Sequence, residues 1–187
     1  MSLLQDDDEL DASLIQALAT CAASGASAPP PSLRERVLQA LSSANRFADL
    51  LDDCARLADV PAGQMDAWLR ALDDAGSWHA ELVPGAAIFH IEPGPSLQSA
   101  AVGFVRVLPG VTFPHHAHGG RERSFLVQGA LRDSLGNERR RGQLLTVDES
   151  ADHSFIALPG PPLIYLVVIE GGLSFGDEHI PSSDPRL

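Results

Sequence analysis

Three histidines and a glutamate stand close together in PHHAHGGRERSFLVQG, which runs from Pro114 to Gly129. Histidine and carboxylate side chains are common ligands of zinc and other transition metals. Side chains alternate between the two faces of a β-strand, so two histidines share a face only when they are two residues apart. This parity selects His116 and His118, and it turns His115 to the opposite face. We therefore expect only two of the three histidines to bind a metal.

Two further ligands are expected from neighbouring strands. Past the Gly119-Gly120 turn, Glu122 begins a strand on which its carboxylate can face the histidine pair, and His153 stands at the head of another strand, HSFIAL. Three imidazoles and one carboxylate suit zinc, iron, manganese, nickel or copper, and an octahedral metal keeps one or two positions for water or substrate. We expect a divalent transition metal at His116, His118, Glu122 and His153, with zinc favoured over iron, manganese or nickel.

The second half of the chain reads as an antiparallel barrel or sandwich. From about Trp78, prolines and glycines separate short apolar segments, as is typical of all-β folds. The expected strands are AAIFHIE, SAAVGFVRV, RSFLVQGALRD, QLLTVDE, HSFIAL, LIYLVVIE and GLSFG. In LIYLVVI the residues on both faces of the strand are apolar. Phe125 and Val127 lie on the strand face opposite the one that carries Glu122. A strand with water on one side should alternate, so we expect the N-terminal helices or a second subunit to cover the outer face.

The first part of the chain reads as helical. Ser32 and Glu35 form a capping-box pattern at the start of SLRERVLQAL, a second helix follows through ADLLDDCARLA, and a third begins at Pro61 and stops at Gly76. The predicted organisation is a short helical N-terminus over residues 1–28, a proline linker over 29–31, a helical segment over 32–76 and a β-barrel domain over 77–187.

The spacing of the candidate ligands resembles the first cupin motif. Gly110, His116, His118, Glu122 and Gly129 match that motif position for position, and Gly142 followed by His153 resembles the second. Asp148 and Ser150 stand where the family usually has proline and glycine, and Ala157 where it often has asparagine. The resemblance covers roughly Pro84 to Phe175. It implies a mainly β cupin fold, a double-stranded β-helix or jelly-roll barrel, that holds the metal inside.

The layout is similar to that of ChrR-type anti-sigma factors, in which a helical zinc domain is followed by a cupin domain. The stretch PPPSLRERVLQAL before the barrel carries this resemblance. The His-x3-Cys-x2-Cys site of that helical domain is absent, because no histidine precedes His79 and Cys21 and Cys54 lie far apart. The resemblance implies the architecture more than the sigma-factor partner.

Composition limits the remaining function classes. The net charge of −12, from 25 acidic residues against 13 arginines, disfavours direct binding to nucleic acid. The run Arg139 to Arg141 is expected to be a solvated hairpin arm. No segment reads as a membrane span or secretory signal, so we expect a cytoplasmic protein with reduced cysteines. A homodimer is a further expectation, as the commonest way to bury an apolar outer face.

Two functions follow from these observations. The first is a regulatory or sensor module that binds a small ligand at the metal and contacts a partner protein through residues 1–76, where Asp6 to Glu9 would suit a basic surface. The alternative is a metal-dependent cupin enzyme, a dioxygenase or isomerase acting on a small organic substrate. Apart from the metal ligands, the expected strands offer one tyrosine, Tyr165, and no acid/base pair. We expect no role at the metal for His79, His90 or His179.

Overall fold

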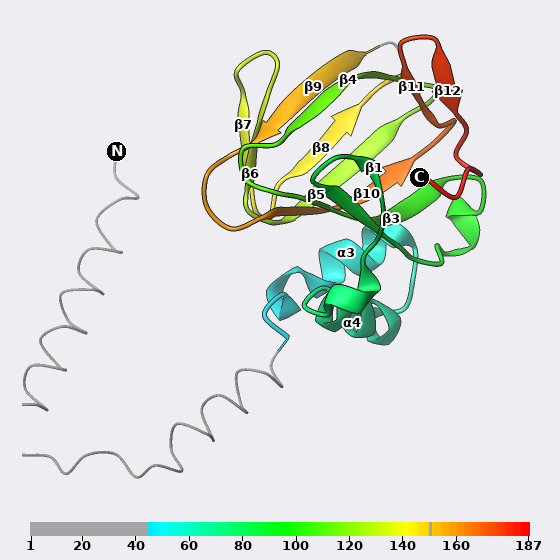
Figure 1. Ribbon diagram of the computed structural model, residues 1–187. Helices are drawn as coiled ribbons and strands as arrows, with labels where there is room; N and C mark the ends of the chain where they lie inside the picture. The colour runs from blue at the N-terminus through cyan, green and yellow to red at the C-terminus, as the bar shows by residue number, and fades with distance from the viewer. Residues whose placement is uncertain (1–44, 150) are drawn as a thin grey trace, which may run out of the picture. The chain divides into compact units, whose positions relative to one another are not determined.

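Two antiparallel sheets face each other and form the barrel (Figure 1). The computed structural model describes residues 45–149 and 151–187, and within them Asn45–Leu187 form one compact unit. The first sheet has the strand order β1-β2-β3-β10-β5-β8, and the second has the order β12-β11-β4-β9-β6-β7. This is the jelly-roll arrangement of a cupin, as the sequence predicts.

The strands are short, as the spacing of prolines and glycines indicates. The first sheet contains β1 (His79–Val83), β2 (Ala86–His90), β3 (Ala101–Val107), β5 (Glu122–Gln128), β8 (Leu144–Val147) and β10 (Leu163–Ile169). The second contains β4 (Thr112–His118), β6 (Ala130–Asp133), β7 (Glu138–Arg140), β9 (Asp152–Ala157), β11 (Leu173–Phe175) and β12 (Glu178–Ile180). Four of them, β1, β4, β7 and β12, are not among the strands expected from apolar segments; β4 is expected instead from the spacing of its histidines, and β7 and β12 consist mostly of polar residues.

One predicted strand, RSFLVQGALRD, is two strands that belong to different sheets. The break is at Gly129, whose φ of 73° lies in the left-handed region that favours glycine. A Cβ at this position would lie 3.0 Å from the Cα of Leu163 and from the backbone oxygen of Pro162. The turn at Gly129 therefore carries the chain from β5 in one sheet to β6 in the other.

Strand β10 shows why both strand parities are apolar. Leu163, Tyr165, Val167 and Ile169 belong to the core inside the barrel. Ile164, Leu166 and Val168 belong to a second core on the outer face of the same sheet. A strand that is buried on both faces reads as a continuous apolar run.

The second core is closed by helices. The structure has a 3-10 turn η1 (Ala48–Leu50), helix α3 (Leu51–Ala58), helix α4 (Ala62–Ala71) and two further 3-10 turns, η2 (Ala75–Ser77) and η3 (Pro95–Leu97). Met65 and Leu69 of α4 are fully buried, and they share the core with Phe104 and Leu166 of the sheet. The predicted cover of the outer face is therefore confirmed, and helices supply it.

The helix ends follow local chemistry. Pro61 occupies the N-cap of α4, where its missing N–H costs nothing. Helix α3 ends at Ala58 and is followed by Asp59, whose φ of 57° is left-handed. Helix α4 ends at Ala71, five residues before the predicted stop at Gly76. The carboxylate of Asp74 accepts a hydrogen bond from the backbone N–H of Gly76 and starts the 3-10 turn η2 instead.

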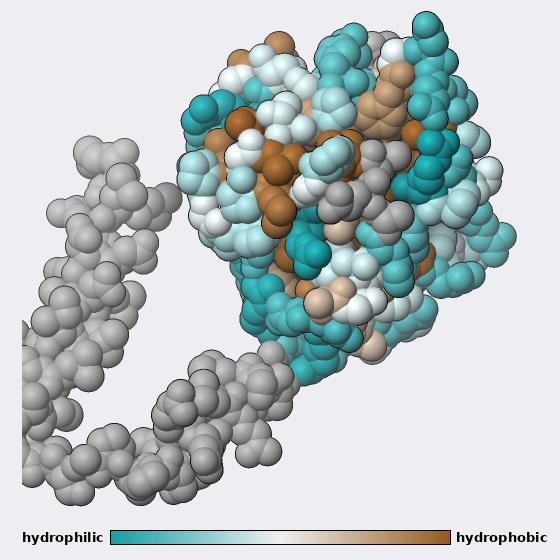
Figure 2. Space-filling model, viewed as in Figure 1, coloured by the Kyte–Doolittle hydropathy of each residue, from teal (hydrophilic) through white to brown (hydrophobic). Residues whose placement is uncertain are grey.

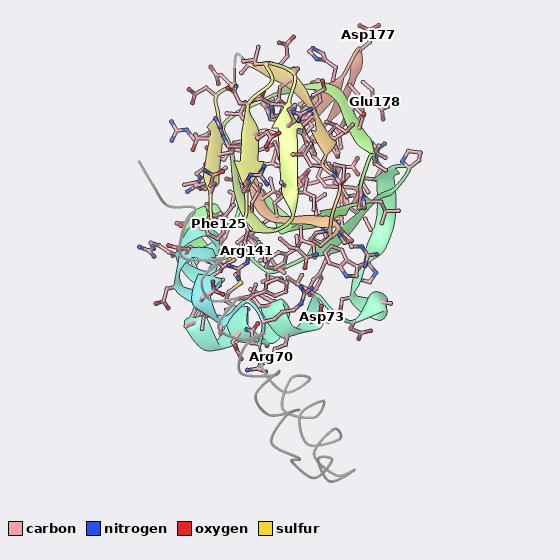
Figure 3. All side chains as sticks on the ribbon, turned by 90° about the vertical axis from the view of Figure 1, so that its left-hand side faces the viewer. Arg70, Asp73, Phe125, Arg141, Asp177 and Glu178 are labelled. Carbon is pink, nitrogen blue, oxygen red and sulfur yellow. The ribbon has the colours of Figure 1, made fainter. Side chains whose placement is uncertain are left out.

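An ion pair ties the helical layer to the barrel. The Arg141 guanidinium donates two hydrogen bonds, of 2.7 and 2.8 Å, to the carboxylate of Asp49. Figure 3 shows Arg141 and Phe125 beside the helices, between them and the barrel. Arg139 and Arg140 lie on the β6–β7 hairpin, as predicted, where Arg140 pairs with Glu138. In the view of Figure 2, hydrophilic residues cover most of the helical surface, and apolar residues gather over the barrel.

Several predictions fall outside the described residues. They are the helix within 1–28, the linker at 29–31, the capping-box helix that begins at Ser32, and the side chains of Cys21 and Ser150. Cys54 is a buried free thiol, and burial raises its pKa to about 12. Within the described part of the chain, no helix is long and apolar enough to cross a membrane. The predicted domain boundaries stay predictions.

Candidate metal centre

Strand β4 presents two of its three histidines to the barrel interior. His116 and His118 are 3 and 5 % exposed, whereas His115 points out and its Nε2 lies 3.0 Å from the carboxylate of Asp152. Strand β9 pairs with β4 so that His153 stands directly opposite His116. The parity predicted from the sequence is confirmed. The pairing of strands that lie far apart in the chain brings the third imidazole to the same place.

Glu122 reaches the histidines from the other sheet. It is the first residue of β5, it is 7 % exposed, and its Oε1 accepts a 2.7 Å hydrogen bond from the hydroxyl of Ser124. The tight turn before it needs glycine, because a Cβ at Gly119 would lie 2.4 Å from the backbone oxygen of Gly171. This turn takes the chain across the barrel, so residues of β4 and β5 face each other.

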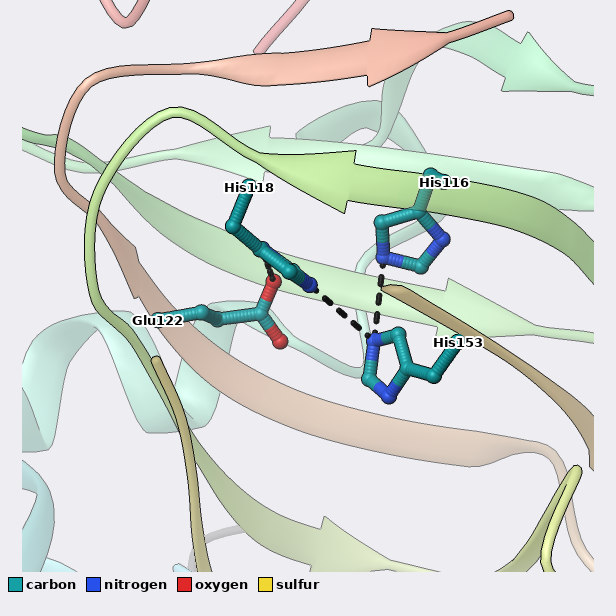
Figure 4. Close-up of side chains that lie close together, drawn as sticks. All are labelled: His116, His118, Glu122 and His153. Atoms are coloured by element: carbon teal, nitrogen blue, oxygen red, sulfur yellow. Dashed lines mark hydrogen bonds and ion pairs between the residues drawn. The ribbon is translucent and has the colours of Figure 1, made fainter. Parts of the chain in front are cut away.

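The four side chains converge on one point (Figure 4). One ligand atom from each of them lies within 4.8 Å of all the others. The Nε2 atom of His153 is 3.1 Å from Nε2 of His116 and 3.3 Å from Nε2 of His118. Three imidazole nitrogens and a carboxylate at such distances form a cluster that can bind a divalent metal.

A bound cation satisfies the converging imidazole nitrogens better than protons alone can. His116 Nδ1 donates to the backbone oxygen of Pro114 at 2.9 Å, which leaves a lone pair on Nε2 of the neutral ring. A proton on Nε2 of His153 can be donated to that lone pair, but it cannot be donated to Nε2 of His118 at the same time. Nδ1 of His118 is buried without a hydrogen-bond partner, and Oε2 of Glu122 lies 3.4 Å away from it. A metal ion would satisfy the three converging Nε2 atoms together, and Nδ1 of His118 would then carry the proton of that ring and face Glu122.

Burial sets the protonation states of the cluster. It lowers the pKa of His116 and of His118 to about 4, and it lowers the pKa of His153 as well. Burial raises the pKa of Glu122 to about 7, against the opposing effect of the Ser124 hydrogen bond. At neutral pH the imidazoles are therefore neutral, which is the form that binds metals. A divalent cation would draw the proton from Glu122.

An apolar cavity adjoins the cluster. Its volume is about 30 Å³, which is room for two or three waters. The cluster members His116 and Glu122 form part of its wall, and the other lining residues are Ala86, Ile88, Val105, Phe113, Phe155, Tyr165, Val167, Ile169, Leu173 and Leu187. Phe113 stacks on Phe155 with ring centroids 5.2 Å apart. The cavity can hold a small apolar group next to a metal.

A second, smaller cavity lies on another side of the cluster. It is lined by Glu122, Ser124, Leu131, Asp133, Leu145, His153, Phe155 and Tyr165. Tyr165 lines both cavities, and burial together with the charge of Glu122 raises its pKa well above the ordinary value. The sequence points to Ser124, which shares the parity of Glu122. It carries no signal for Asp133 or Leu187, which enter the cavities only through tertiary structure.

The remaining histidines lie outside the cluster. His79 and His90 are on β1 and β2, and Nδ1 of His179 on β12 lies 3.0 Å from the hydroxyl of Ser174. None of the three belongs to the group of ligand atoms around His116. This agrees with the expectation that they have no role at the metal.

Comparison with solved structures supports the fold. No family model and no curated protein matches the sequence. The structure of Rhodobacter sphaeroides SigE in complex with the anti-sigma ChrR matches with a TM-score of 0.52 and 21% identity, over 89% of this chain and 82% of the other. An acetylacetone dioxygenase from Acinetobacter johnsonii matches with a TM-score of 0.50 and 15% identity, over 59% of this chain and 83% of the other.

These likenesses identify the fold class. The protein has the cupin fold, with a helical segment before the barrel and a cluster of three histidines and one glutamate inside it. Among cupins it resembles the anti-sigma ChrR in architecture, because that match extends over most of both chains.

Proposed function

We propose that this protein is a regulatory cupin that binds a divalent metal, with zinc favoured, and senses a small ligand at that metal. The observation that carries the proposal is the convergence of His116, His118, Glu122 and His153 within 4.8 Å, with Nε2 of His153 3.1 and 3.3 Å from Nε2 of the other two histidines. One proton on Nε2 of His153 can satisfy only one of these neighbours at a time. A metal ion bound by the three Nε2 atoms would satisfy all of them.

The chain's own residues have separate tasks in this proposal. The three histidines and Glu122 hold the ion, the hydroxyl of Ser124 fixes the carboxylate of Glu122, and the backbone oxygen of Pro114 fixes the tautomer of His116. Such supporting contacts orient metal ligands and tune their affinity. The bound metal would supply a Lewis-acid position for one ligand atom. The apolar wall around Phe113 and Phe155 excludes water from that position.

The composition of the cavity favours binding over acid–base turnover. Apart from His116 and Glu122, its lining is apolar except for the hydroxyl of Tyr165. A general acid or base needs a group that can exchange protons near neutral pH. The raised pKa of Tyr165 keeps it protonated. Because Glu122 and His116 are engaged at the proposed metal, they do not exchange protons with the ligand, and such a site can recognise a ligand with little means of moving its protons.

The regulatory part of the proposal concerns residues 1–76. The match to the SigE–ChrR structure covers 89% of this chain, which is more than its barrel. Helices α3 and α4 bury their apolar faces on the barrel. A structural change inside the barrel can therefore reach these helices through packed side chains. We propose that a partner protein contacts residues 1–76 and that ligand binding at the metal alters this contact. A cytoplasmic location is part of the proposal, and so is a homodimer, although helices α3 and α4 already cover the outer face that motivated the dimer.

Metal analysis and partner capture test this function together. Protein purified without added metal is expected to carry close to one equivalent of zinc. Full-length protein should capture a partner that a variant lacking residues 1–44 does not. Full-length Glu122→Ala protein should show altered capture. The proposal fails if the purified protein carries no metal and binds none when titrated, or if capture is the same with all three proteins.

An enzymatic function is the alternative, and the cavity beside the cluster favours it. His116 and Glu122 both line this cavity, so a substrate in it would touch the metal. The fold likeness to an acetylacetone dioxygenase suggests a probe. Oxygen uptake by the iron-loaded protein with acetylacetone, absent in the His116→Ala variant, would favour the enzyme over the sensor.

A further inference from the structure

The hydroxyl of Tyr165 stands out among the groups that line the cavity. Tyr165 is 6 % exposed, it lies in the middle of β10, and its side chain points to the barrel interior, where its ring contacts Phe155 edge-on at 6.0 Å. In the described residues no side chain or backbone group forms a hydrogen bond with its hydroxyl. Over the part of the chain that the structure describes, the fully buried polar side-chain atom without a partner is Nδ1 of His118, whereas the hydroxyl of Tyr165 is available to a molecule in the cavities that this residue lines.

The position of Tyr165 relative to the cluster suggests what its hydroxyl can form a hydrogen bond with. Tyr165 and Glu122 line the same two cavities, and the charge of Glu122 acts on the tyrosine. A molecule bound at the metal in the apolar cavity therefore shares that cavity with Tyr165. The hydroxyl can donate one hydrogen bond to an oxygen of that molecule.

Charge balance narrows the class of ligand. A divalent metal with one carboxylate and three neutral imidazoles carries a net charge of about +1. Among the side chains that line the apolar cavity, Glu122 alone is an ionisable acid or base besides His116 and Tyr165. A buried net charge is unfavourable in apolar surroundings. A monoanion would neutralise the site, whereas a dianion would leave a buried negative charge with no cationic side chain in the lining to offset it.

We propose that Tyr165 is a positioning residue for a small monoanionic oxygen ligand, a short-chain carboxylate or enolate with an apolar body, which binds the metal and accepts a hydrogen bond from the tyrosine hydroxyl. This inference rests on the proposed metal site and names the chemistry of its ligand. The apolar body lies against side chains such as Phe113 and Val167. The narrow cavity favours a body of only a few carbon atoms.

The test compares two probes that differ in the atom that meets the metal. Isobutyrate and 2-methylpropane-1-thiol, which binds a metal as its thiolate, share an apolar body and carry a single negative charge when bound, but sulfur is a weak hydrogen-bond acceptor. Both are titrated anaerobically into cobalt-loaded protein, and the visible spectrum of the cobalt reports binding. Wild type is compared with Tyr165→Phe, which removes only the hydroxyl, and with Val167→Ala, which changes the same cavity wall without changing a polar group.

Tyr165→Phe should weaken isobutyrate binding about 10- to 100-fold, as expected for a hydrogen bond to a charged acceptor. It should change thiolate binding less than about threefold and leave the cobalt content at one equivalent. Val167→Ala should affect the two probes alike. Equal effects of Tyr165→Phe on both probes, loss of cobalt from that variant, or no binding of isobutyrate to wild type would each overturn the inference. If wild type binds no cobalt, the proposed metal site fails as well.

Discussion

His116 and His153 face each other across strands β4 and β9, with their Nε2 atoms 3.1 Å apart. They are separated by 37 positions in the sequence, and the antiparallel pairing of the two strands makes them direct neighbours. Since Nδ1 of His116 is engaged by the backbone oxygen of Pro114, its Nε2 is the atom left to bind a metal. Variants of this pair and its neighbours therefore test the site.

Replacing an inward-facing residue should remove the metal, and replacing the outward-facing histidine should not. His116→Ala or Glu122→Ala is expected to lose most of the bound metal, because each removes one of four converging ligands. His115→Ala is the matched control, since that side chain is exposed and contacts Asp152. Elemental analysis of the purified variants measures the effect. Equal metal loss from His115→Ala and His116→Ala would show that the strand parity is wrong.

Metal affinity should fall as the pH drops below 7. Metal-free protein holds a proton on Glu122 below its pKa of about 7, whereas His116 and His118 stay neutral down to about pH 4. Burial lowers the pKa of His153 as well, so just below pH 7 the metal must displace mainly the proton on Glu122, and affinity should decrease about tenfold per pH unit between pH 7 and 6. Competition with a chelator of known affinity at each pH measures this slope.

The Glu122→Gln variant is the control for the pH dependence. It keeps the shape of the side chain but cannot ionise, so its weaker metal binding should vary little between pH 7 and 6. A slope of two or three protons per metal in the wild-type protein at pH 6 would contradict the prediction. It would mean that the histidines take up protons in the same range.

Loss of the Ser124 hydroxyl should weaken metal binding without destroying the site. Ser124 donates a 2.7 Å hydrogen bond to the carboxylate of Glu122 and so fixes its orientation. Ser124→Ala is expected to lower metal affinity about 10- to 100-fold, as is typical of residues that orient a metal ligand. Metal titration followed by calorimetry gives the value. Ser174→Ala, which removes an exposed hydroxyl, should leave the affinity unchanged; a matching loss there would point to a general effect on folding.

The helical cover should contribute strongly to stability. Leu69 of α4 is fully buried against the outer face of the sheet. Leu69→Ala is expected to lower the free energy of unfolding by about 2–5 kcal/mol, because it removes buried apolar surface and leaves a cavity. Denaturant unfolding measures the change. Leu135→Ala, at a position 86 % exposed, should alter stability by less than about 0.5 kcal/mol; similar losses in the two variants would show that α4 does not pack on the barrel.

The sequence by itself determined the class of fold and the parity of the site. The alternation of side chains along a strand is a local property, so it already separates His115 from His116 and His118. In the same way, apolar residues at both parities of LIYLVVI predicted that the sheet is covered on its outer face, and the structure places α3 and α4 there. The RSFLVQGALRD segment was misread as one strand, because a glycine alone does not show that the chain changes sheets.

Tertiary structure alone decided how distant residues meet. The depth at which His116, His118 and Glu122 are buried depends on both sheets, and so do the shifts of their pKa values. The same holds for Leu187, which lines the cavity beside the cluster although it lies 65 positions beyond Glu122 in the sequence. Burial and cavity shape arise from contacts between segments far apart in the chain, and the local periodicity of the sequence does not predict those contacts.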